Sequence, residues 1–361
     1  MAALRTALVG CGPMAGWHTS AVDALDEFDL IALCDISEEN ARALAGKTGV
    51  DAVYTDFAAM LSEQTPDVVI VVTPNDSHAA LTIQAAEAGA RGVLCEKPMA
   101  TCMREGRAMV EACREHGVAL VVNHQRRMSP PMLKMRELID AGAIGELKLI
   151  RGSCAGDLLS DATHLVDTIR FLTGDAPVSW VVGQIHREVD EAVQRDPNNV
   201  QLVSAGHRYG HPVETGAIGI WEFAGGARAE LLVGDLRLMD RPYGDYEVFG
   251  TEGRIWRNGD MPDVPLSIQD GAGGWRAVDV EPSDGGEQHV VTARDSYARF
   301  AETLKTGCDH PLSGDSALRD LEIIMAVFES ARLRKKMTLP LDQDEFPLRL
   351  MIEDGSPAPG T

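Results

Sequence analysis

The first pattern with a chemical use is Gly10, Gly12 and Ala15 in the spacing G-x-G-x-x-A, with Pro13 and Met14 between the last two. The first glycine permits a tight turn, the second lets the backbone approach a pyrophosphate, and the small third residue allows close helix–strand packing. Backbone N–H groups and the dipole of a following helix would hold the phosphates. The motif predicts a dinucleotide site. The alternative is an ordinary tight turn between a strand and a helix.

An acidic residue stands where such a cofactor needs one. Asp35 ends the next apolar stretch, about 20 residues after the glycine motif, where a carboxylate accepts hydrogen bonds from the adenosine ribose hydroxyls. The same carboxylate repels a 2′-phosphate, and no basic residue follows until Arg42. The sequence therefore predicts NAD, with NADP less favoured. The alternatives for Asp35 are a helix N-cap and an exposed strand end.

Two further polar segments follow apolar stretches. Thr73, Asn75 and His78 lie in TPNDSH, and Glu96 and Lys97 come after GVLC, directly before a proline. Ligands of open α/β sheets bind outside the carboxyl ends of the strands, so we expect both segments at the cofactor. Taken singly, His78 is more typical of a helix start than of a ligand. An isolated Glu-Lys-Pro is more typical of a charged turn.

Strand and helix patterns alternate through the first third of the chain. Strands are predicted at residues 6–10, 30–35, 67–74, 92–95 and 118–122, and helices at about 15–25, from 38, at 78–89 and at 100–116. Ser37 is suited to cap the second helix. Such alternation is typical of βαβ units with right-handed crossovers. We predict an α/β protein in which residues 1–124 form a Rossmann domain, an open doubly wound parallel sheet.

After about residue 124 the pattern changes. GAIGIWEF and ARAELLVGD flank a Gly-Gly turn and predict a hairpin, and DYEVFGTEGRIWRNGD predicts another strand-turn-strand unit. Helices are predicted at about 132–141, 162–172, 293–306 and 316–335. We therefore predict a second α/β domain over residues 125–345 with an open, mostly antiparallel sheet. A tail, 346–361, ends in Pro, Gly and Ser and is expected to be frayed.

Composition limits the class of partner and the compartment. A length of 361 residues favours two domains. With 55 acidic against 33 basic residues the net charge is −22, which disfavours nucleic acid and anionic membranes as partners. The seven cysteines are scattered without zinc-ligand spacing, so we expect no metal and a cytoplasmic location. The apolar runs are far shorter than the roughly 20 residues that span a bilayer.

With these residues assembled, the chain resembles the Gfo/Idh/MocA oxidoreductases. The matching segments are ALVGCGPMA, CDISEENA, VVTPNDSH, VLCEKPMA, VNHQRRMSP, THLVDTIRFLTG, EVFGTEGRI and HPLSGDSALRDLEIIMAVFESARLRKKMTLPL. They cover most of the chain in order. The resemblance implies a Rossmann domain and an open-sheet domain that commonly makes a homodimer or homotetramer. It also implies NAD(P)-dependent oxidation of a hydroxyl on a sugar, sugar derivative or cyclitol.

The resemblance also implies residue roles. In the family, the lysine of the EKP motif lies near the nicotinamide and the reacting hydroxyl, and the glutamate lies by the cofactor. These residues are Lys97 and Glu96. Lys97 would either take the hydroxyl proton, if burial or a positive charge lowers its free pKa of about 10.4, or stay charged while a histidine takes it. The proline after the lysine fixes the backbone there and is compatible with a cis bond.

The partner histidine is His164 in SDATHLVD. The family usually has an aspartate four residues before this histidine, whereas here the nearest upstream acid, Asp161, stands three before it. We count Asp161 as a catalytic candidate that supports His164, with a helix N-cap as the alternative. Arg127 resembles a family arginine, for which substrate contact and an interdomain ion pair are both open. Gln125 is a candidate for the nicotinamide end of the cofactor.

Three classes of function remain. The first is an NAD-dependent dehydrogenase of a sugar or cyclitol. The second is a glycosidase of the same fold that uses bound NAD transiently to oxidise, eliminate, hydrate and reduce; Glu96, Lys97 and His164 suit either chemistry. The third is a non-catalytic NAD or sugar sensor. The presence of Lys97 and His164, and the lack of a basic patch, argue against a sensor.

Overall fold

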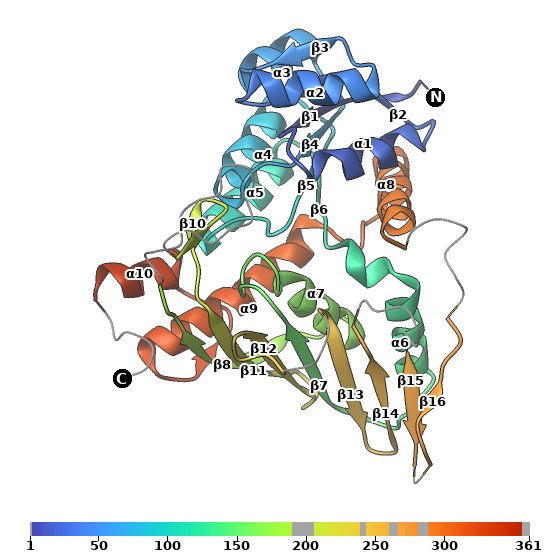
Figure 1. Ribbon diagram of the computed structural model, residues 1–361, viewed down its shortest axis with the longest axis vertical. Helices are drawn as coiled ribbons and strands as arrows, with labels where there is room; N and C mark the ends of the chain where they lie inside the picture. Colours follow the sequence, from blue (N-terminus) through green and yellow to red (C-terminus); the bar gives the residue numbers. More distant parts are fainter. Residues whose placement is uncertain are drawn as a thin grey trace. The chain divides into compact units, whose positions relative to one another are not determined.

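The computed structural model describes residues 2–189, 206–238, 243–259, 266–271, 273–280 and 288–355 (Figure 1). The chain divides into two compact units. The first unit consists of Met1–Met128 and Ser283–Leu318, and the second of Ser129–Pro282 and Arg319–Thr361. Each unit has a main sheet of its own.

The sheet of the first unit has six parallel strands in the order β3-β2-β1-β4-β5-β6. They are β1 (Leu4–Val9), β2 (Phe28–Cys34), β3 (Ala52–Tyr54), β4 (Val68–Val71), β5 (Gly92–Cys95) and β6 (Ala119–Val122). All four residues of β4 are fully buried, which is why its sequence is continuously apolar. The strand order reverses between β1 and β4, the place where such sheets bind ligands. The predicted Rossmann architecture is confirmed.

Six α-helices and two short 3-10 turns complete this unit. They are α1 (Ala15–Asp23), α2 (Glu38–Thr48), α3 (Phe57–Gln64), α4 (His78–Glu87), α5 (Met103–Glu115), α8 (Gln288–Thr306), η1 (Asn75–Ser77) and η2 (Gln125–Met128). The Ser37 hydroxyl accepts the Asn40 N–H at 3.3 Å and so caps α2, as predicted. Asp56 caps α3 in the same way through the Ala59 N–H, at 3.0 Å.

Helix α8 belongs to the first unit, which differs from the prediction of an uninterrupted second domain over residues 125–345. Its Tyr297 and Phe300 are buried in one core cluster with Phe28 of β2 and residues of α1. Phe300 also packs on the backbone of Gly92 in β5. An apolar stripe indicates that one face of a helix is buried, but not in which of two cores. The prediction followed the order of the chain and therefore placed residues 283–318 in the second domain, whereas they belong to the first unit. Residues 125–128 likewise close the first unit.

The main sheet of the second unit has nine strands in the order β16-β15-β14-β13-β7-β12-β11-β8-β17. They are β7 (Leu147–Cys154), β8 (Val178–His186), β11 (Gly216–Phe223), β12 (Arg228–Gly234), β13 (Asp245–Gly250), β14 (Gly253–Arg257), β15 (Ser267–Asp270), β16 (Arg276–Ala277) and β17 (Met337–Thr338). Among these described strands only β7 and β12 pair in parallel, so the predicted mostly antiparallel sheet is confirmed, hairpins included. A separate hairpin joins β9 (His207–Arg208) to β10 (His211–Pro212).

Helices cover one face of this sheet. The second unit contains α6 (Pro130–Asp140), α7 (Thr163–Leu172), most of α9 (Gly314–Leu333) and α10 (Pro347–Glu353). Gly152 of β7 lies under Leu165 and Ile169 of α7, and Gly183 and Gly219 lie under Val327 of α9. Because glycine has no side chain, these helices can approach the strands closely.

The segment expected to be a frayed tail contains α10. Phe346 is 2% exposed and its ring packs edge-on against Phe328 of α9, with 5.2 Å between the ring centres. Leu348 and Met351 are buried beside it. The prediction gave weight to the terminal Pro, Gly and Ser and overlooked these three apolar residues. Residues 356–361 lie outside the described part of the chain.

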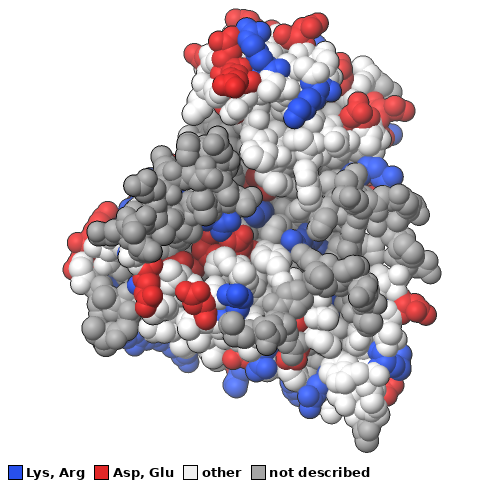
Figure 2. All heavy atoms as spheres, in the orientation of Figure 1, with Lys and Arg blue, Asp and Glu red and all other residues white. Residues whose placement is uncertain are grey.

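The described surface carries both signs of charge. Acidic and basic side chains are interspersed on the face that Figure 2 shows. Exposed ion pairs such as Arg42–Glu38 and Arg114–Glu111 each stabilise the fold by at most about 1 kcal/mol. No helix in the described part of the chain is long and apolar enough to cross a membrane.

The contact between α8 and β5 is testable at Gly92. A Cβ at this position would lie 2.6 Å from the Phe300 ring and 2.9 Å from the Leu304 side chain. We expect Gly92→Ala to destabilise the first unit by about 1–3 kcal/mol, measured as a lower urea midpoint. Gly46, in exposed α2, has open space around its Cα, so Gly46→Ala is the matched control and should stabilise by about 0.4–1 kcal/mol. Equal effects at the two sites would contradict the packing described.

Candidate active site

The glycine loop joins β1 to α1. Gly10 has φ of +95°, and a Cβ there would lie 2.3 Å from the Val72 carbonyl oxygen, so only glycine fits. A Cβ on Gly12 would meet nothing within 4 Å, which leaves open space in front of the loop. Unlike α2 and α3, α1 has no side-chain cap at its N-terminus, where Met14 is the N-cap residue. An open cradle before an uncapped helix fits a pyrophosphate.

The Asp35 carboxylate holds this loop. Its Oδ2 accepts the Cys11 N–H at 2.7 Å, and its Oδ1 accepts the Ser37 N–H at 2.8 Å. Because a carboxylate oxygen accepts more than one hydrogen bond, both oxygens keep capacity for ribose hydroxyls. Ser37, not Asp35, caps α2, so the N-cap alternative for Asp35 is wrong. The nearest following cation, Arg42, is paired with Glu38 at 2.6 Å.

The segment after β4 is bound to the segment after β5 by His78. This side chain is fully buried, and its ring nitrogens each lie 2.8 Å from a backbone carbonyl oxygen, of Pro98 and of Thr73. Burial lowers the pKa of His78 although the two carbonyls and Glu96 act in the opposite direction. In this geometry the His78 ring joins two loops, and a cofactor contact for His78 stays a prediction. Asn75 is 6% exposed at the start of η1.

Glu96 lies at the centre of a buried polar network. Its Oε1 accepts hydrogen bonds from Asn123 Nδ2 at 2.6 Å and His18 Nε2 at 3.0 Å, and its Oε2 accepts the Lys97 N–H at 3.2 Å. The other His18 nitrogen, Nδ1, lies 2.7 Å from the Tyr297 hydroxyl. Burial raises the pKa of Glu96, but His18, Lys97 and Asn123 together lower it to about 2. Glu96 is therefore an anion at neutral pH.

Two buried acceptors lie at the end of β6. Asn123 Oδ1 and Gln125 Oε1 have no hydrogen-bond partner among the described residues. Because Asn123 must present its amide nitrogen to Glu96, its oxygen has to point elsewhere. A buried acceptor without a donor costs about 1–3 kcal/mol and is typical of a place that a ligand or water completes. These atoms, like the glycine cradle, fit a bound dinucleotide.

Three residues of this network were missed by sequence reasoning. Asn123 had a signal, because it stands at the end of a predicted strand two residues before Gln125. His18 and Tyr297 had none, since 279 positions separate them and neither lies in a motif of known chemistry. The Lys97–Pro98 peptide bond is cis, as the sequence allowed.

Arg127 lies in the first unit. Its side chain is 3% exposed and its guanidinium donates to the Pro311 carbonyl at 3.4 Å. Lys97 is in the same unit, whereas His164 and Asp161 are in the second. The shared proton handling of Lys97 and His164, and a substrate contact for Arg127, therefore stay predictions.

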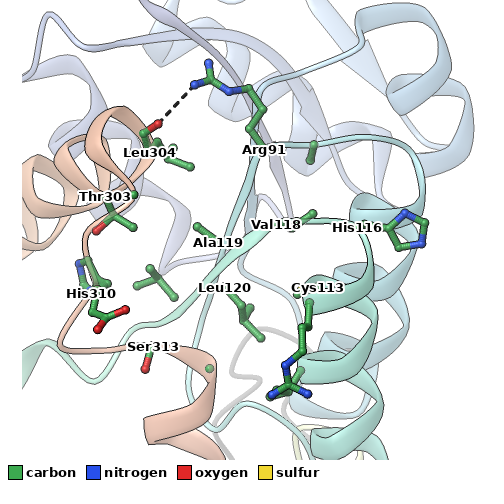
Figure 3. A pocket seen from close by; sticks show the side chains of 18 of the residues that line it. Arg91, Cys113, His116, Val118, Ala119, Leu120, Thr303, Leu304, His310 and Ser313 are labelled. Carbon is green, nitrogen blue, oxygen red and sulfur yellow. Dashed lines mark hydrogen bonds between the residues drawn. The ribbon is translucent and has the colours of Figure 1, made fainter.

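A cavity of about 600 Å³ lies elsewhere in the first unit, along the outer edge of β6 (Figure 3). Its lining includes Arg91, Leu120, Thr303 and His310, and Arg91 donates to the Leu304 carbonyl at 3.4 Å. None of the predicted cofactor or catalytic residues lines it. We therefore do not assign it to the active site.

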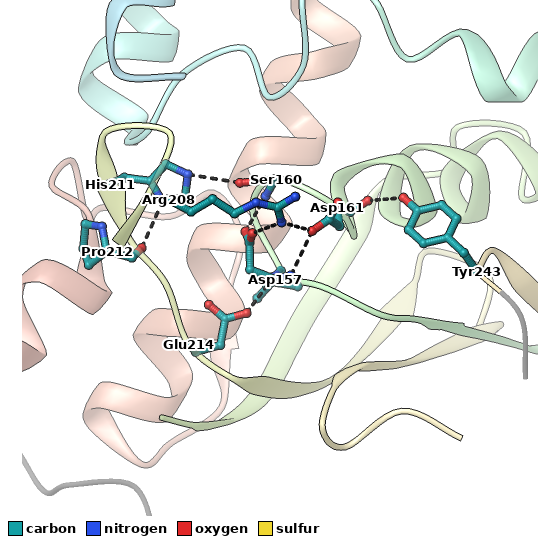
Figure 4. A network of polar contacts seen from close by, with 9 residues as sticks. Asp157, Ser160, Asp161, Arg208, His211, Pro212, Glu214 and Tyr243 are labelled. Carbon is teal, nitrogen blue, oxygen red and sulfur yellow. Dashed lines mark hydrogen bonds and ion pairs between the residues drawn. The ribbon is translucent and has the colours of Figure 1, made fainter. Parts of the chain in front are cut away.

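In the second unit, Asp161 has partners that the sequence did not indicate, and its predicted support of His164 stays a prediction. It forms an ion pair with Arg208 of β9, and its Oδ2 also accepts the Asp157 N–H at 3.1 Å (Figure 4). The Tyr243 hydroxyl donates to the backbone carbonyl of Asp161 at 2.7 Å. The N-cap residue of α7 is Ala162, so the N-cap alternative for Asp161 is wrong. Sequence spacing alone gave no sign of Arg208. The buried His164 follows in the first turn of α7.

The same cluster holds a buried glutamate. Glu214 is 3% exposed and accepts the Leu158 N–H at 2.6 Å (Figure 4). Burial, together with the negative charges of Asp157 and Asp161, raises the pKa of Glu214 to about 8. Arg208 lies 2.9 Å from Asp157 as well, so one arginine serves two aspartates. Glu214 is therefore mainly in its neutral form at pH 7.

A six-stranded parallel sheet that carries a glycine cradle, with an acidic residue at the end of β2, defines a dinucleotide-binding Rossmann protein. Residues 4–124 match the family model described as "Oxidoreductase family, NAD-binding Rossmann fold", and residues 132–256 match the GFO/IDH/MocA C-terminal domain. The chain is 30% identical over 355 residues to inositol 2-dehydrogenase of Rhizobium meliloti, covering 93% of this chain and 99% of that protein. It belongs to the Gfo/Idh/MocA family of oxidoreductases.

Other relatives agree with this assignment. D-apiose dehydrogenase of Paraburkholderia graminis is 36% identical over 173 residues, 47% of this chain and 46% of that protein, so the match spans about half of that relative. A solved structure of levoglucosan dehydrogenase, in complex with NADH and levoglucosan, superposes with a TM-score of 0.77 at 23% identity. It covers 94% of this chain and 100% of that one, which shows a common fold.

The protonation of Glu214 predicts a pH-dependent stability. Its folded-state pKa of about 8 lies above the ordinary 4.5. The contribution of its neutral form to the free energy of unfolding is therefore fully present below pH 4.5 and is lost as the pH rises through 8. Glu214→Gln stays neutral at every pH. We expect the variant to have a Tm at least about 2–4 °C above the parent at about pH 9, with little difference at about pH 5. Glu353→Gln, at an exposed position of α10, is the control. The same pH dependence of Tm in the parent and in Glu214→Gln would contradict the raised pKa of Glu214.

Proposed function

We propose that the protein is an NAD-dependent dehydrogenase that oxidises a hydroxyl of a sugar, sugar derivative or cyclitol to a carbonyl. The observation that carries this proposal is the Asp35 carboxylate, which holds the Gly10–Gly12 cradle and keeps acceptor capacity for ribose hydroxyls. The negative charge of Asp35, and the pairing of Arg42 with Glu38, favour NAD over NADP. Gly10, Gly12, Pro13, Met14, Asp35, Thr73, Asn75, Glu96, Asn123 and Gln125 would hold the cofactor.

In the proposed mechanism, bound NAD would supply the acceptor for the hydride that leaves the carbinol carbon. The hydroxyl proton goes to the protein. Lys97 hydrogen-bonds the hydroxyl oxygen, and the buried imidazole of His164 receives the proton. Ionised Glu96 fixes the backbone of Lys97 through its N–H. The substrate would lose its carbinol hydrogen as hydride and its hydroxyl hydrogen as a proton, which leaves a carbonyl on the product and a protonated base on the protein.

We also propose that the protein self-associates through the face of the second sheet opposite α7 and α9, as a homodimer or homotetramer. Val182 and Ile220 are 40% and 37% exposed on neighbouring strands. Trp180 of β8 lies beside them and donates to Glu222 at 3.1 Å. An exposed apolar patch bordered by charges is typical of a protein interface. A cytoplasmic location suits the seven cysteines, all of which are free thiols.

The proposed chemistry predicts that NADH accumulates when purified protein and NAD meet the right sugar or cyclitol. We expect Lys97→Ala to lower kcat by at least about 100-fold with its Tm unchanged, because it removes the group that binds the reacting oxygen. Lys47→Ala, on exposed α2, is the control. Near-normal turnover by Lys97→Ala would sink the mechanism. Cleavage of a glycoside without net NADH, by protein that retains bound NAD, would establish the glycosidase instead.

The proposed cofactor preference predicts the effect of a charge change at Asp35. Asp35→Asn keeps the acceptor for the Cys11 N–H but removes the charge that repels a 2′-phosphate. We expect the ratio of NADP to NAD affinity to rise at least about tenfold, measured by fluorescence titration of the reduced cofactors. Asp29→Asn, exposed in β2, is the control and should leave the ratio unchanged. An unchanged ratio in Asp35→Asn would place the ribose elsewhere.

A further inference from the structure

The network around Glu96 joins four separate parts of the first unit. His18 comes from α1, directly after the glycine loop, and Tyr297 from α8. Glu96 and Asn123 follow β5 and β6. All four side chains are buried, with residue exposures of 1–7%. Sequence motifs account for Glu96 only, so the roles of His18 and Tyr297 come from the geometry.

The direction of each hydrogen bond follows from the partners. Burial and the charge of Glu96 raise the pKa of Tyr297 well above its ordinary value, so its hydroxyl keeps its proton. The Glu96 carboxylate can only accept, which requires N–H on Nε2 of His18. With this N–H directed at Glu96, Nδ1 of the ring lies 2.7 Å from the Tyr297 hydroxyl. Tyr297 thus holds the His18 ring in the orientation in which Nε2 donates to Glu96.

This donation keeps a charge where the fold needs one. Glu96 is 7% exposed, and burial alone favours its neutral form. His18 and Asn123 both donate to Oε1, which leaves Oε2 to hold the Lys97 N–H at 3.2 Å. Loss of the His18 donor would leave a buried carboxylate with one strong donor in place of two. A protonated Glu96 would then be a weaker acceptor for the Lys97 backbone.

We infer that His18, oriented by Tyr297, is a positioning residue for the proposed reaction: it donates to Glu96, which holds the Lys97 N–H, and it ties that pair to the helix of the pyrophosphate cradle. The inference rests on the function proposed above for Lys97. His18 touches neither substrate nor the reacting atoms, and acts through Glu96.

The other titratable groups that face Glu96 are few. They are Lys97 and Cys95 of its own segment, His78 of α4 and Tyr297 of α8. Burial raises the pKa of Cys95 far above neutrality and lowers that of His78. Lys97, Cys95 and His78 are present in every variant below, so among these groups the variants differ only at His18, Glu96 and Tyr297.

A double-mutant cycle separates this role from simple packing. We compare the parent with His18→Leu, Glu96→Gln and the double variant, between about pH 5 and pH 9. NADH affinity by fluorescence titration and kcat are the two measurements. In His18→Leu the pKa of Glu96 should rise. At about pH 5 we then expect NADH affinity and kcat to be at least about tenfold below those of the parent, and at about pH 9 we expect both to approach the parent's values. In the Glu96→Gln background the same change at His18 should have no pH-dependent effect.

Controls address folding and specificity. His18→Gln, whose amide also donates to Glu96, should restore most of the acid-side loss, and Tyr297→Phe, which removes one hydroxyl, should reproduce part of it. His116→Gln, an exposed histidine of the same unit, should match the parent. If His18→Leu does not fold, Tyr297→Phe, with and without Glu96→Gln, provides the same comparison.

The outcomes are distinct. A loss in His18→Leu that is independent of pH, and equal with and without Glu96→Gln, would overturn the inference and leave His18 a packing residue. An acid-side loss that requires the native Glu96 would support it. Should no variant, nor the parent, turn over any polyol, the proposed function fails; the pH dependence of NADH affinity still decides the role of His18.

Discussion

The burial of one negative charge constrains the whole first unit. A carboxylate removed from water costs several kcal/mol unless the fold supplies donors, and Glu96 is 7% exposed. Its donors come from α1 and from the end of β6, and the donor on α1 is itself oriented by α8. The strands and helices that carry these side chains must therefore be in place together. The helix from late in the chain, α8, packs on α1 and β2 through apolar side chains and brings Tyr297 to His18.

The two buried glutamates show how surroundings decide charge. Glu96 meets two strong donors, so its pKa falls to about 2 in spite of burial. Glu214 meets one backbone N–H and two aspartates, so its pKa rises to about 8. Arg208 neutralises Asp157 and Asp161 only in part, since it is one cation against two anions. Similar burial thus gives an anion in one unit and a neutral acid in the other.

Features with local causes were predictable from sequence. The glycine spacing, Asp35 after β2 and the Ser37 cap each depend on residues within one βαβ unit, and the alternation of patterns gave both sheet types. Features with distant causes were not. The unit that α8 joins, the His18–Tyr297 contact and the capture of Asp161 by Arg208 depend on which surfaces meet after folding. Hydrophobic patterning and secondary-structure propensity predict the conformation of a segment, but not the segment against which it packs. For Asp161, the sequence suggested support of His164 in spite of a departure from the family spacing, and it gave no sign of the ion pair with Arg208.

The division of the first unit into two chain segments has a consequence for synthesis. Residues 1–128 contain the whole parallel sheet, but α8 follows only after the intervening 129–282. A ribosome adds about 5–20 residues per second. Roughly 10–30 s therefore pass between the synthesis of residue 128 and that of α8, the helix that packs with Phe28 and orients His18. During that interval an apolar surface on α1 and β2 is open to other proteins. The nascent chain is therefore a candidate client for chaperones that bind exposed apolar surface until the last helices emerge.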